Sequence, residues 1–244
     1  MIKPYIAYIF MFEKEHGIIV ACDVDDIEKL RELVEKTYSI EGIVGYKIGA
    51  NLALQYGLKN IMDEVDFQLP VIYDHQKAGT DIPYIAEKFA KSCKISGVDG
   101  VIIFPQAGPV SEEAFIDAIF SNELIPMVGG EMTHPSYLAE DGGFLKDDAP
   151  SIIYEIACKK GVEYFIVPGN KEEAIKKYHI LLTSLINEPK YCMPGIGRQG
   201  GEIRKTFAIL RGYPSYAIVG SSIYKSEDIE KRAREFAMEA MEFE

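Results

Sequence analysis

Two acids and a lysine follow one short apolar run of the sequence. The run 71–73 ends in Asp74, Lys77 comes three residues later, and Asp81 lies four residues beyond it. A carboxylate beside a lysine raises the pKa of the ammonium group, and a second one holds it in place, so this trio predicts a proton donor fixed next to negative charge. The alternative is an incidental ion pair on an exposed loop, and the motif alone does not separate the two.

Eight apolar runs, each followed by a stretch with helical spacing, must position these residues. The expected strands are 17–23, 43–48, 70–74, 100–104, 124–128, 163–167, 190–193 and 216–219. The expected helices are 25–36, 51–65, 82–96, 111–120, 149–161, 171–186, 203–210 and 226–243. Continuous apolar runs predict parallel strands buried on both faces, and eight strand–helix units predict a closed (β/α)8 TIM barrel. An open doubly wound sheet, which usually has fewer strands, is the alternative.

The chain reads as a single domain. No linker, low-complexity tract or shift in composition divides its 244 residues. We expect residues 1–16 to form an arm or helix that closes the amino-terminal end of the barrel and residues 17–244 to form the barrel. The apolar start resembles a signal peptide, but it has one lysine, no small-residue cleavage pattern and a charged segment at 13–16. We therefore expect no signal peptide here; a reducing cytoplasm fits the cysteines, which suggest no disulfide framework.

Composition narrows the class of ligand. The net charge of −12 repels nucleic acid and anionic lipid, and no stretch approaches the ~20 apolar residues of a membrane span. The four cysteines form no Cys-x-x-Cys pair, so neither a zinc site nor a disulfide framework is predicted. The histidines show no metal-ligand spacing either: we expect His16 and His179 on the surface, His75 as polar lining or a proton relay, and His134 as a brace for its loop. The sequence thus predicts a small-molecule ligand and no metal.

In a barrel of this kind, the carboxyl ends of the strands surround one mouth. Asp23, Lys47, Asp74 and Lys77 all fall at or near such ends. Two lysines that alternate with two aspartates there would shift one another's pKa values, as in a poised proton donor. A lysine inside a buried strand is rarely without a partner, so a purely structural ion pair of Lys47 with Asp23 or Asp74 stays open.

Two glycine-rich turns follow the seventh and eighth expected strands. Such turns expose backbone N–H groups, and this is where TIM barrels hold phosphate; simple tight turns are the alternative. A basic side chain and an amide on the first turn would add charge-assisted and neutral hydrogen bonds. The candidate phosphate-binding residues are Pro194, Gly195, Gly197, Arg198 and Gln199 on the first turn and Gly220 and Ser221 on the second.

Together, these motifs resemble the orotidine 5′-phosphate decarboxylase family, particularly its archaeal members. The resemblance rests on Asp74…Lys77…Asp81-Ile82-Pro83, on Tyr46-Lys47-Ile48-Gly49, on Glu131-Met132-Thr133-His134-Pro135 and on the segment 194–201, and it runs in order from about residue 18 to residue 224. It implies a cofactor-free, homodimeric barrel. Its substrate would be a nucleotide, orotidine 5′-phosphate, which it converts to uridine 5′-phosphate and carbon dioxide in pyrimidine biosynthesis.

The resemblance assigns roles residue by residue. Lys47 and Asp74 would belong to a charged network, with Asp74 close to the departing carboxylate. Lys77 would protonate the vinyl carbanion that remains. Asp81 and Ile82 would reach into the site of the partner subunit.

The same resemblance assigns the binding roles. Asp23 would bind ribose, Thr133 would stand where the family has a serine that contacts the pyrimidine, and Gln199 would close over the phosphate. An ammonium that stabilises developing carbanion charge in a closed site agrees with the chemistry read from the residues.

Three positions depart from the family pattern. Each interval of Asp-x-Lys-x-x-Asp is one residue longer here, so a bulge or an early strand end must re-aim Lys77. Ser221 replaces the phosphate-binding arginine after the eighth strand, and Arg198 is the candidate substitute. Ile85 stands where a ribose-binding threonine is expected.

These departures keep two other hypotheses open. One is a sister enzyme of the same superfamily that acts on another phosphorylated sugar, as a magnesium-dependent aldolase or decarboxylase. The other is a non-catalytic barrel that binds a phosphate ligand.

Overall fold

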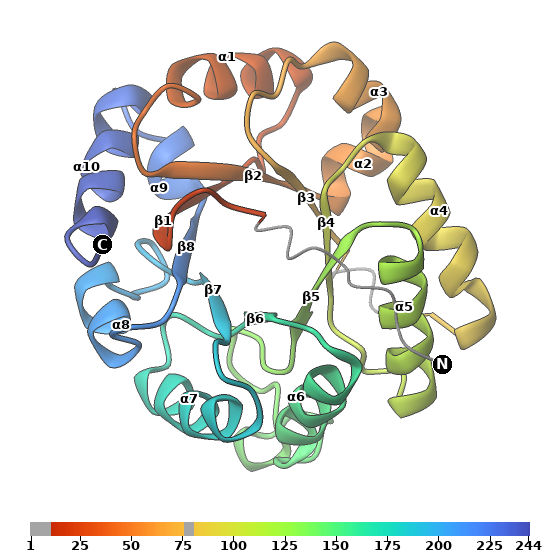
Figure 1. Ribbon diagram of the computed structural model, residues 1–244. Coiled ribbons are helices and arrows are strands. Elements are labelled where there is room, and N and C mark those ends of the chain that lie inside the picture. Colours follow the sequence, from red (N-terminus) through yellow and green to blue (C-terminus); the bar gives the residue numbers. More distant parts are fainter. Residues whose placement is uncertain (1–10, 76–80) are drawn as a thin grey trace.

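Eight parallel strands close into a barrel in the order of the chain, with each strand paired to the next and β8 paired to β1 (Figure 1). The computed structural model describes residues 11–75 and 81–244. The strands are β1 (His16–Ala21), β2 (Ile43–Gly49), β3 (Val71–Asp74), β4 (Gly100–Ile103), β5 (Ile125–Gly129), β6 (Tyr164–Ile166), β7 (Lys190–Pro194) and β8 (Ser215–Val219). The predicted TIM barrel is confirmed.

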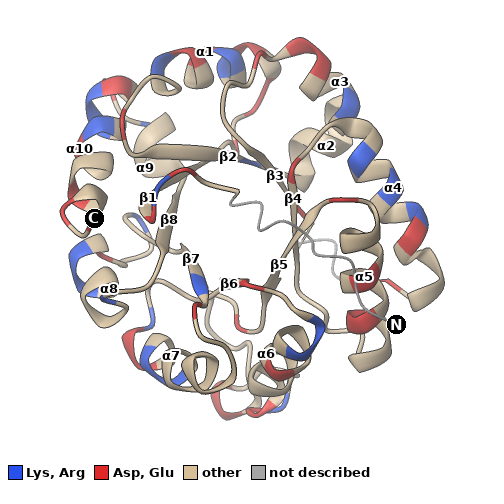
Figure 2. Ribbon diagram, viewed as in Figure 1, with Lys and Arg blue, Asp and Glu red and all other residues tan. Residues whose placement is uncertain are grey.

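Helices surround the barrel, and many charged residues lie along them (Figure 2). They are α1 (Ile27–Thr37), α2 (Ala50–Tyr56), α3 (Leu58–Glu64), α4 (Ala86–Ser96), α5 (Pro109–Ser121), α6 (Ala149–Lys160), α7 (Glu172–Leu185), α8 (Ile203–Ile209), α9 (Ser221–Tyr224) and α10 (Ile229–Met241), with short 3-10 turns η2 (Pro83–Ile85) and η3 (Ala139–Asp141). Asp26 and Asp228 cap α1 and α10 by accepting hydrogen bonds from backbone N–H groups.

Several predicted boundaries were wrong for local reasons. The expected helix at 51–65 is two helices, because Gly57 between them has a φ of +81°, which ends a helix. The helix expected from residue 82 begins as the 3-10 turn η2 after Ile82, whose extended backbone is typical of a residue before proline. The last helix begins only at its cap, Asp228.

Apolar side chains cover the strands on both faces. One cluster fills the space between strands and helices, and a second fills the barrel interior. The interior cluster includes Met11 and Phe12, which precede β1; the ring of Phe12 lies 4.6 Å from that of Tyr216 and 5.8 Å from that of Tyr164. The segment before β1 therefore adds side chains to the barrel interior.

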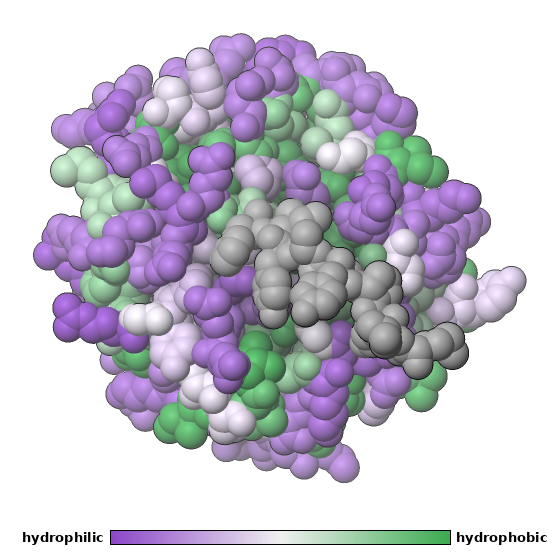
Figure 3. All heavy atoms as spheres, viewed as in Figure 1, coloured by the Kyte–Doolittle hydropathy of each residue, from purple (hydrophilic) through white to green (hydrophobic). Residues whose placement is uncertain are grey.

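The outer surface is mostly hydrophilic on the face that Figure 3 shows, with separate hydrophobic patches. Among the described residues, no helix combines the length and apolar character needed to cross a bilayer. His16, which was expected on the surface, is instead buried beside Phe207 and Phe243, because the first strand begins at this residue.

Candidate active site

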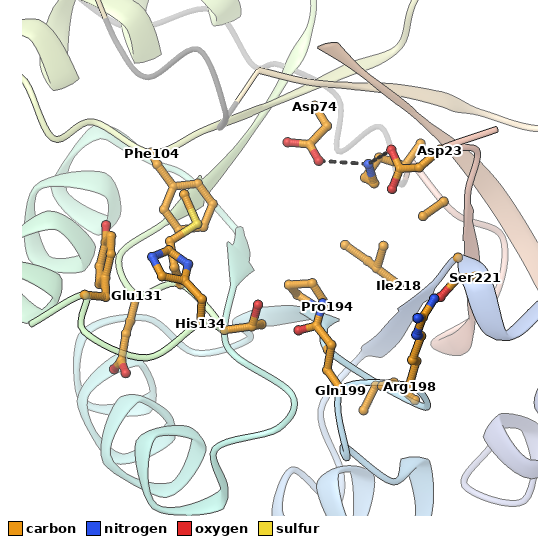
Figure 4. Close-up of a pocket in the computed structure, with 18 of the residues that line it drawn as sticks. Asp23, Asp74, Phe104, Glu131, His134, Pro194, Arg198, Gln199, Ile218 and Ser221 are labelled. Carbon is orange, nitrogen blue, oxygen red and sulfur yellow. Dashed lines mark hydrogen bonds and ion pairs between the residues drawn. The ribbon is translucent and has the colours of Figure 1, made fainter. Parts of the chain in front are cut away.

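Lys47 lies between two aspartates at the mouth of the barrel. Its neighbours on β2, Tyr46 and Ile48, pack outward against the helices, so strand alternation turns Lys47 inward. The Lys47 ammonium lies 2.9 Å from Asp74 Oδ2 and 3.3 Å from Asp23 Oδ1 (Figure 4). The side chains of Lys47 and Asp74 are 6% and 1% exposed, whereas that of Asp23 is 39% exposed.

Electrostatics keep this lysine charged. Burial by itself lowers the pKa of Lys47, but attraction to Asp74 and Asp23 outweighs burial and raises the pKa above its ordinary value. Both of the ion pairs considered for Lys47 are present, because the same ammonium contacts Asp23 and Asp74. The result is a fixed cation between one buried and one half-exposed carboxylate.

Gly49 makes this arrangement possible. It pairs with Asp74 across β2 and β3, and a Cβ atom at this position would lie 2.6 Å from Asp23 Oδ1. Any side chain at Gly49 would therefore displace Asp23 from Lys47.

A cavity of about 910 Å³ opens above the carboxyl ends of the strands. Its volume lies in the range of small-molecule sites. Of the candidate residues, those that line it are Asp23, Lys47, Asp74, Thr133, Pro194, Gly195, Arg198, Gln199, Gly220 and Ser221. The structure thus brings the charged network, the pyrimidine candidate and both glycine-rich turns to one cavity. Lys77 lies outside the described residues.

The glycine-rich turn after β7 is hydrogen-bonded within itself. Gly197 N–H donates to Gly201 O, Gly200 N–H to Gly197 O, and Gly201 N–H to Gly195 O, at 2.8 to 3.0 Å. These three N–H groups are therefore already used, which corrects the expectation that the whole turn exposes its amides. Gly197 does not line the cavity; it packs against Ser222, whose Oγ would lie 2.5 Å from a Cβ at Gly197.

Arg198 joins the two turns. Its backbone N–H donates to Ser222 Oγ at 3.1 Å, and its side chain points toward Ser221 (Figure 4). Helix α9 begins at Ser221, and the N–H groups of Ile223 and Tyr224 already donate to Gly220 O at 2.8 and 3.1 Å. Arg198 and Ser221 both line the cavity, so a guanidinium and the start of α9 lie together in its wall.

Asp81 and Ile82 lie away from the cavity. Both are exposed, and Ile82 is 59% exposed just before η2. Ser111 Oγ donates to the backbone oxygen of Asp81 at 2.9 Å and so ties this segment to the start of α5. Tyr84 and Val110 are exposed beside them, which leaves an apolar patch on the outer surface.

The sequence of this barrel matches a known protein family. The sequence profile described as "Orotidine 5′-phosphate decarboxylase / HUMPS family" matches residues 17–236, which include all eight strands apart from the first residue of β1, His16. The chain belongs to this family.

Named relatives in the orotidine 5′-phosphate decarboxylase / HUMPS family are similar along almost the whole chain. The orotidine 5′-phosphate decarboxylase of Methanosarcina acetivorans is 28% identical over 227 residues, which cover 93% of this chain and 96% of the relative. That of Thermococcus kodakarensis is 29% identical over 230 residues, 94% of this chain and 99% of the relative. The crystal structure of the Methanocaldococcus jannaschii enzyme complexed with the inhibitor BMP has a TM-score of 0.77 at 27% identity and covers 92% of this chain and 98% of that one.

Other residues that line the cavity were missed at the sequence level. Phe104 forms part of its apolar lining and lies over Gly129, where a Cβ would be 2.2 Å from its ring. Tyr137 accepts a hydrogen bond from Gln106 Nε2 at 3.0 Å, and burial raises the pKa of Tyr137 to about 12, so its hydroxyl stays protonated. Gln106 could have been noticed, because it follows the fourth strand.

Two histidine predictions can be compared with the site. His75 is not among the described residues that line the cavity; it contacts Tyr73 OH through Nδ1 at 3.1 Å and packs on Phe89. His134 lines the cavity and packs edge-on against Tyr137. Of the two, only His134 is placed to touch a ligand in this family member.

Proposed function

We propose that this chain decarboxylates orotidine 5′-phosphate to uridine 5′-phosphate and carbon dioxide, as a cytoplasmic enzyme of pyrimidine biosynthesis. Family membership and the printed names of the relatives support the reaction class. The observation that carries the proposal is one cavity with the Asp23, Lys47 and Asp74 network on one side and the two glycine-rich turns on another. Such a cavity suits a ligand with a phosphate at one end and a reacting centre at the other.

The proposed chemistry breaks the bond between C6 of the pyrimidine and its carboxylate. The electron pair of that bond stays on C6 as a vinyl carbanion, and a proton from the Lys77 ammonium then completes uridine 5′-phosphate. Lys47 holds Asp74 in place near the leaving carboxylate. The fixed ammonium groups would stabilise the developing negative charge in a site that excludes water.

The longer spacing between Asp74 and Lys77 is compatible with this role. The strand β3 ends at Asp74, three positions before Lys77 in the sequence, so a role for Lys77 does not require the side-chain alternation of a longer strand. The placement of Lys77 itself is part of the proposal and rests on the sequence motif.

Substrate binding is divided among the loops. Arg198, which reaches toward Ser221, would replace the missing phosphate-binding arginine, and Gln199 would close over the phosphate. Thr133 would contact the pyrimidine, and Asp23, which is half-exposed beside Lys47, would bind the ribose. We expect Arg198→Ala to raise KM for orotidine 5′-phosphate by 10-fold or more, because a charge-assisted contact is lost.

The functional unit would be a homodimer. Exposed Ile82, Tyr84 and Val110 form an apolar patch next to Asp81, which is itself exposed. Burying this patch against a second copy would remove it from water and carry Asp81 and Ile82 to the partner's site.

A magnesium-dependent sister enzyme remains the second candidate, since the family description covers more than one enzyme name. Against it, the ammonium of Lys47 already lies between the carboxylates of Asp23 and Asp74. A metal bound by both would have to displace this buried cation.

The test follows the loss of absorbance of orotidine 5′-phosphate with purified protein, with and without chelator, beside Lys77→Ala. The proposal predicts chelator-insensitive turnover that Lys77→Ala abolishes. Turnover that chelator abolishes would favour the magnesium-dependent enzyme. A folded wild-type protein that binds BMP but turns nothing over would instead favour a non-catalytic barrel.

A further inference from the structure

The turn between β6 and α7 contacts the two loops that the proposed function assigns to opposite ends of the substrate. The turn spans residues 168–171 and is closed by a hydrogen bond from Lys171 N–H to Pro168 O at 3.0 Å. On one side is the loop after β5, which carries Thr133. On the other is the glycine-rich turn after β7, which begins at Gly195.

Asn170 contacts both loops with one side chain. Its Nδ2 donates a hydrogen bond to the backbone oxygen of Thr133 at 3.1 Å. Its Oδ1 would lie only 3.1 Å from a Cβ atom at Gly195, so the carboxamide packs directly on this glycine. The Thr133 methyl group would lie 3.0 Å from the same Cβ position. Thr133, Asn170 and Gly195 therefore meet at one point behind the cavity wall.

The backbone reinforces this meeting point. Gly169 N–H donates to Pro194 O at 2.8 Å, and a Cβ at Gly201 would lie 2.6 Å from Gly169 O. Both ends of the glycine-rich turn thus rest on the residue before Asn170. One residue further on, Lys171 makes an ion pair with Glu131 Oε1 at 2.7 Å, which attaches the start of the β5 loop to the same turn.

The polar nature of Asn170 calls for an explanation. Its Oδ1 is buried and has no hydrogen-bond partner among the described residues. A buried acceptor without a donor is destabilising, and an apolar side chain of similar size would fill the space without that cost. The Nδ2 group explains why a carboxamide stands here instead of an apolar side chain, because it donates to the backbone oxygen of Thr133 and fixes it in place. Asn170 itself is not among the described residues that line the cavity, so its action on a ligand must be indirect.

We propose that Asn170 is a positioning residue that fixes the pyrimidine-side loop at Thr133 and the phosphate-side turn at Gly195 relative to each other. This inference rests on the proposed function for the identity of the ligand. The link that Asn170 makes between the two loops does not depend on which ligand binds. Holding both loops in the binding geometry before the substrate arrives would reduce the ordering that binding requires.

The first experiment measures amide hydrogen exchange of the ligand-free protein in segments 129–136 and 193–201. The variant Asn170→Ala removes both contacts, and Asn170→Asp keeps an oxygen toward Gly195 but loses the donor to Thr133. Asn122→Ala is the matched control, because Asn122 Nδ2 also donates to a backbone oxygen, that of Ala118 at 2.9 Å, on the distant helix α5.

The proposal predicts that Asn170→Ala speeds exchange at least 5-fold in both segments and that Asn122→Ala changes neither. Asn170→Asp is expected to speed exchange mainly in segment 129–136. Faster exchange in segment 129–136 alone with Asn170→Ala would overturn the link to the phosphate-side turn. No change in either segment would overturn the whole proposal.

A kinetic experiment tests the consequence for turnover. In the active wild type, we expect Asn170→Ala to lower kcat/KM for orotidine 5′-phosphate at least 10-fold, while Asn122→Ala leaves it within 2-fold. Unchanged kcat/KM together with faster exchange would contradict the positioning role in catalysis. A wild-type protein without turnover would overturn the proposed function, and the exchange data would still decide whether Asn170 links the loops.

Discussion

At the scale of single residues, the most consequential contact is that of Lys47 with buried Asp74. Lys47→Met removes an ammonium 2.9 Å from a carboxylate that is 1% exposed. Removing one member of a buried pair typically costs about 3–5 kcal/mol of unfolding free energy. We expect a loss of this size in urea denaturation at pH 7, and at least a 100-fold loss of kcat/KM, because a fixed charge that would stabilise the carbanion is gone.

Lys29→Met is the matched control for Lys47→Met. Lys29 pairs with Asp25 at 3.0 Å, but both side chains are exposed. Little change in stability is expected there. Equal effects of the two substitutions would contradict the special role of the buried pair.

The same lysine gives a pH prediction. Folding raises the pKa of Lys47, so its stabilising effect is complete below the unfolded-state pKa of about 10.4 and is lost only as pH rises through the higher folded-state pKa. The difference in unfolding free energy between wild type and Lys47→Met should therefore stay constant from pH 7 to pH 9. A difference that shrinks across this window would show that Lys47 loses its proton early.

Gly195 and Gly200 provide a second pair of single-residue variants. Both have positive φ, +92° and +94°, so alanine strains the backbone at either site. Only Gly195→Ala would also push against Thr133 and Asn170, because a Cβ at Gly200 meets open space. We expect similar losses of stability by urea denaturation, but a 10-fold greater loss of kcat/KM with Gly195→Ala. Equal kinetic losses would contradict the contact at Gly195.

Sequence reasoning found the charged residues but not the residues that hold them. Asp23, Lys47 and Asp74 could be predicted to converge, because each lies at or near the carboxyl end of a strand. Asn170 also follows a strand, but its role depends on meeting Thr133 and Gly195, which are 37 and 25 positions away in the chain. Contacts behind the cavity wall leave no local pattern in the sequence.

At the scale of elements, helix α5 carries a buried acid with no catalytic role in this account. Glu112 is 1% exposed, and its Oε1 has no hydrogen-bond partner among the described residues. Burial raises the pKa of Glu112 to about 8, with a smaller contribution from Glu113. Between about pH 4.5 and pH 8, the folded protein thus holds a proton that the unfolded chain has released.

Stability should fall across this window as pH rises. We expect the unfolding free energy of the wild type, measured in urea, to decline between pH 5 and pH 8 relative to that of Glu112→Gln, which has no proton to lose. The exposed Glu35→Gln on α1 is the control and should follow the wild type. A parallel pH dependence of wild type and Glu112→Gln would contradict the raised pKa.

The eight strands, each with helical structure after it, were predictable in order, because apolar runs and helical spacing alternate along the chain. The break at Gly57 and the 3-10 turn η2 were not, since helical spacing of apolar residues continues across both. The closed hydrogen bonding of the β7 turn was missed as well. Glycine allows such a turn, but only the fold decides which of its N–H groups are used internally.

At the scale of the whole molecule, the exposed apolar patch of Ile82, Tyr84 and Val110 predicts that two copies of the chain associate. We expect a homodimer in light scattering, and we expect Tyr84→Glu to shift it to monomer and lower turnover, since Asp81 would no longer reach the partner's site. Ile180→Glu on α7 is the control, because Ile180 is exposed at 70% but lies outside this patch. A monomeric, fully active wild type would contradict the shared site.

Decarboxylation with proton delivery to C6 is the central step of the proposed function. The most direct measurement is proton nuclear magnetic resonance of orotidine 5′-phosphate incubated with the protein in deuterated water containing chelator. We predict one equivalent of uridine 5′-phosphate that carries deuterium at C6, and carbon dioxide in equal amount. Unchanged orotidine 5′-phosphate in the presence of folded protein would contradict the central claim.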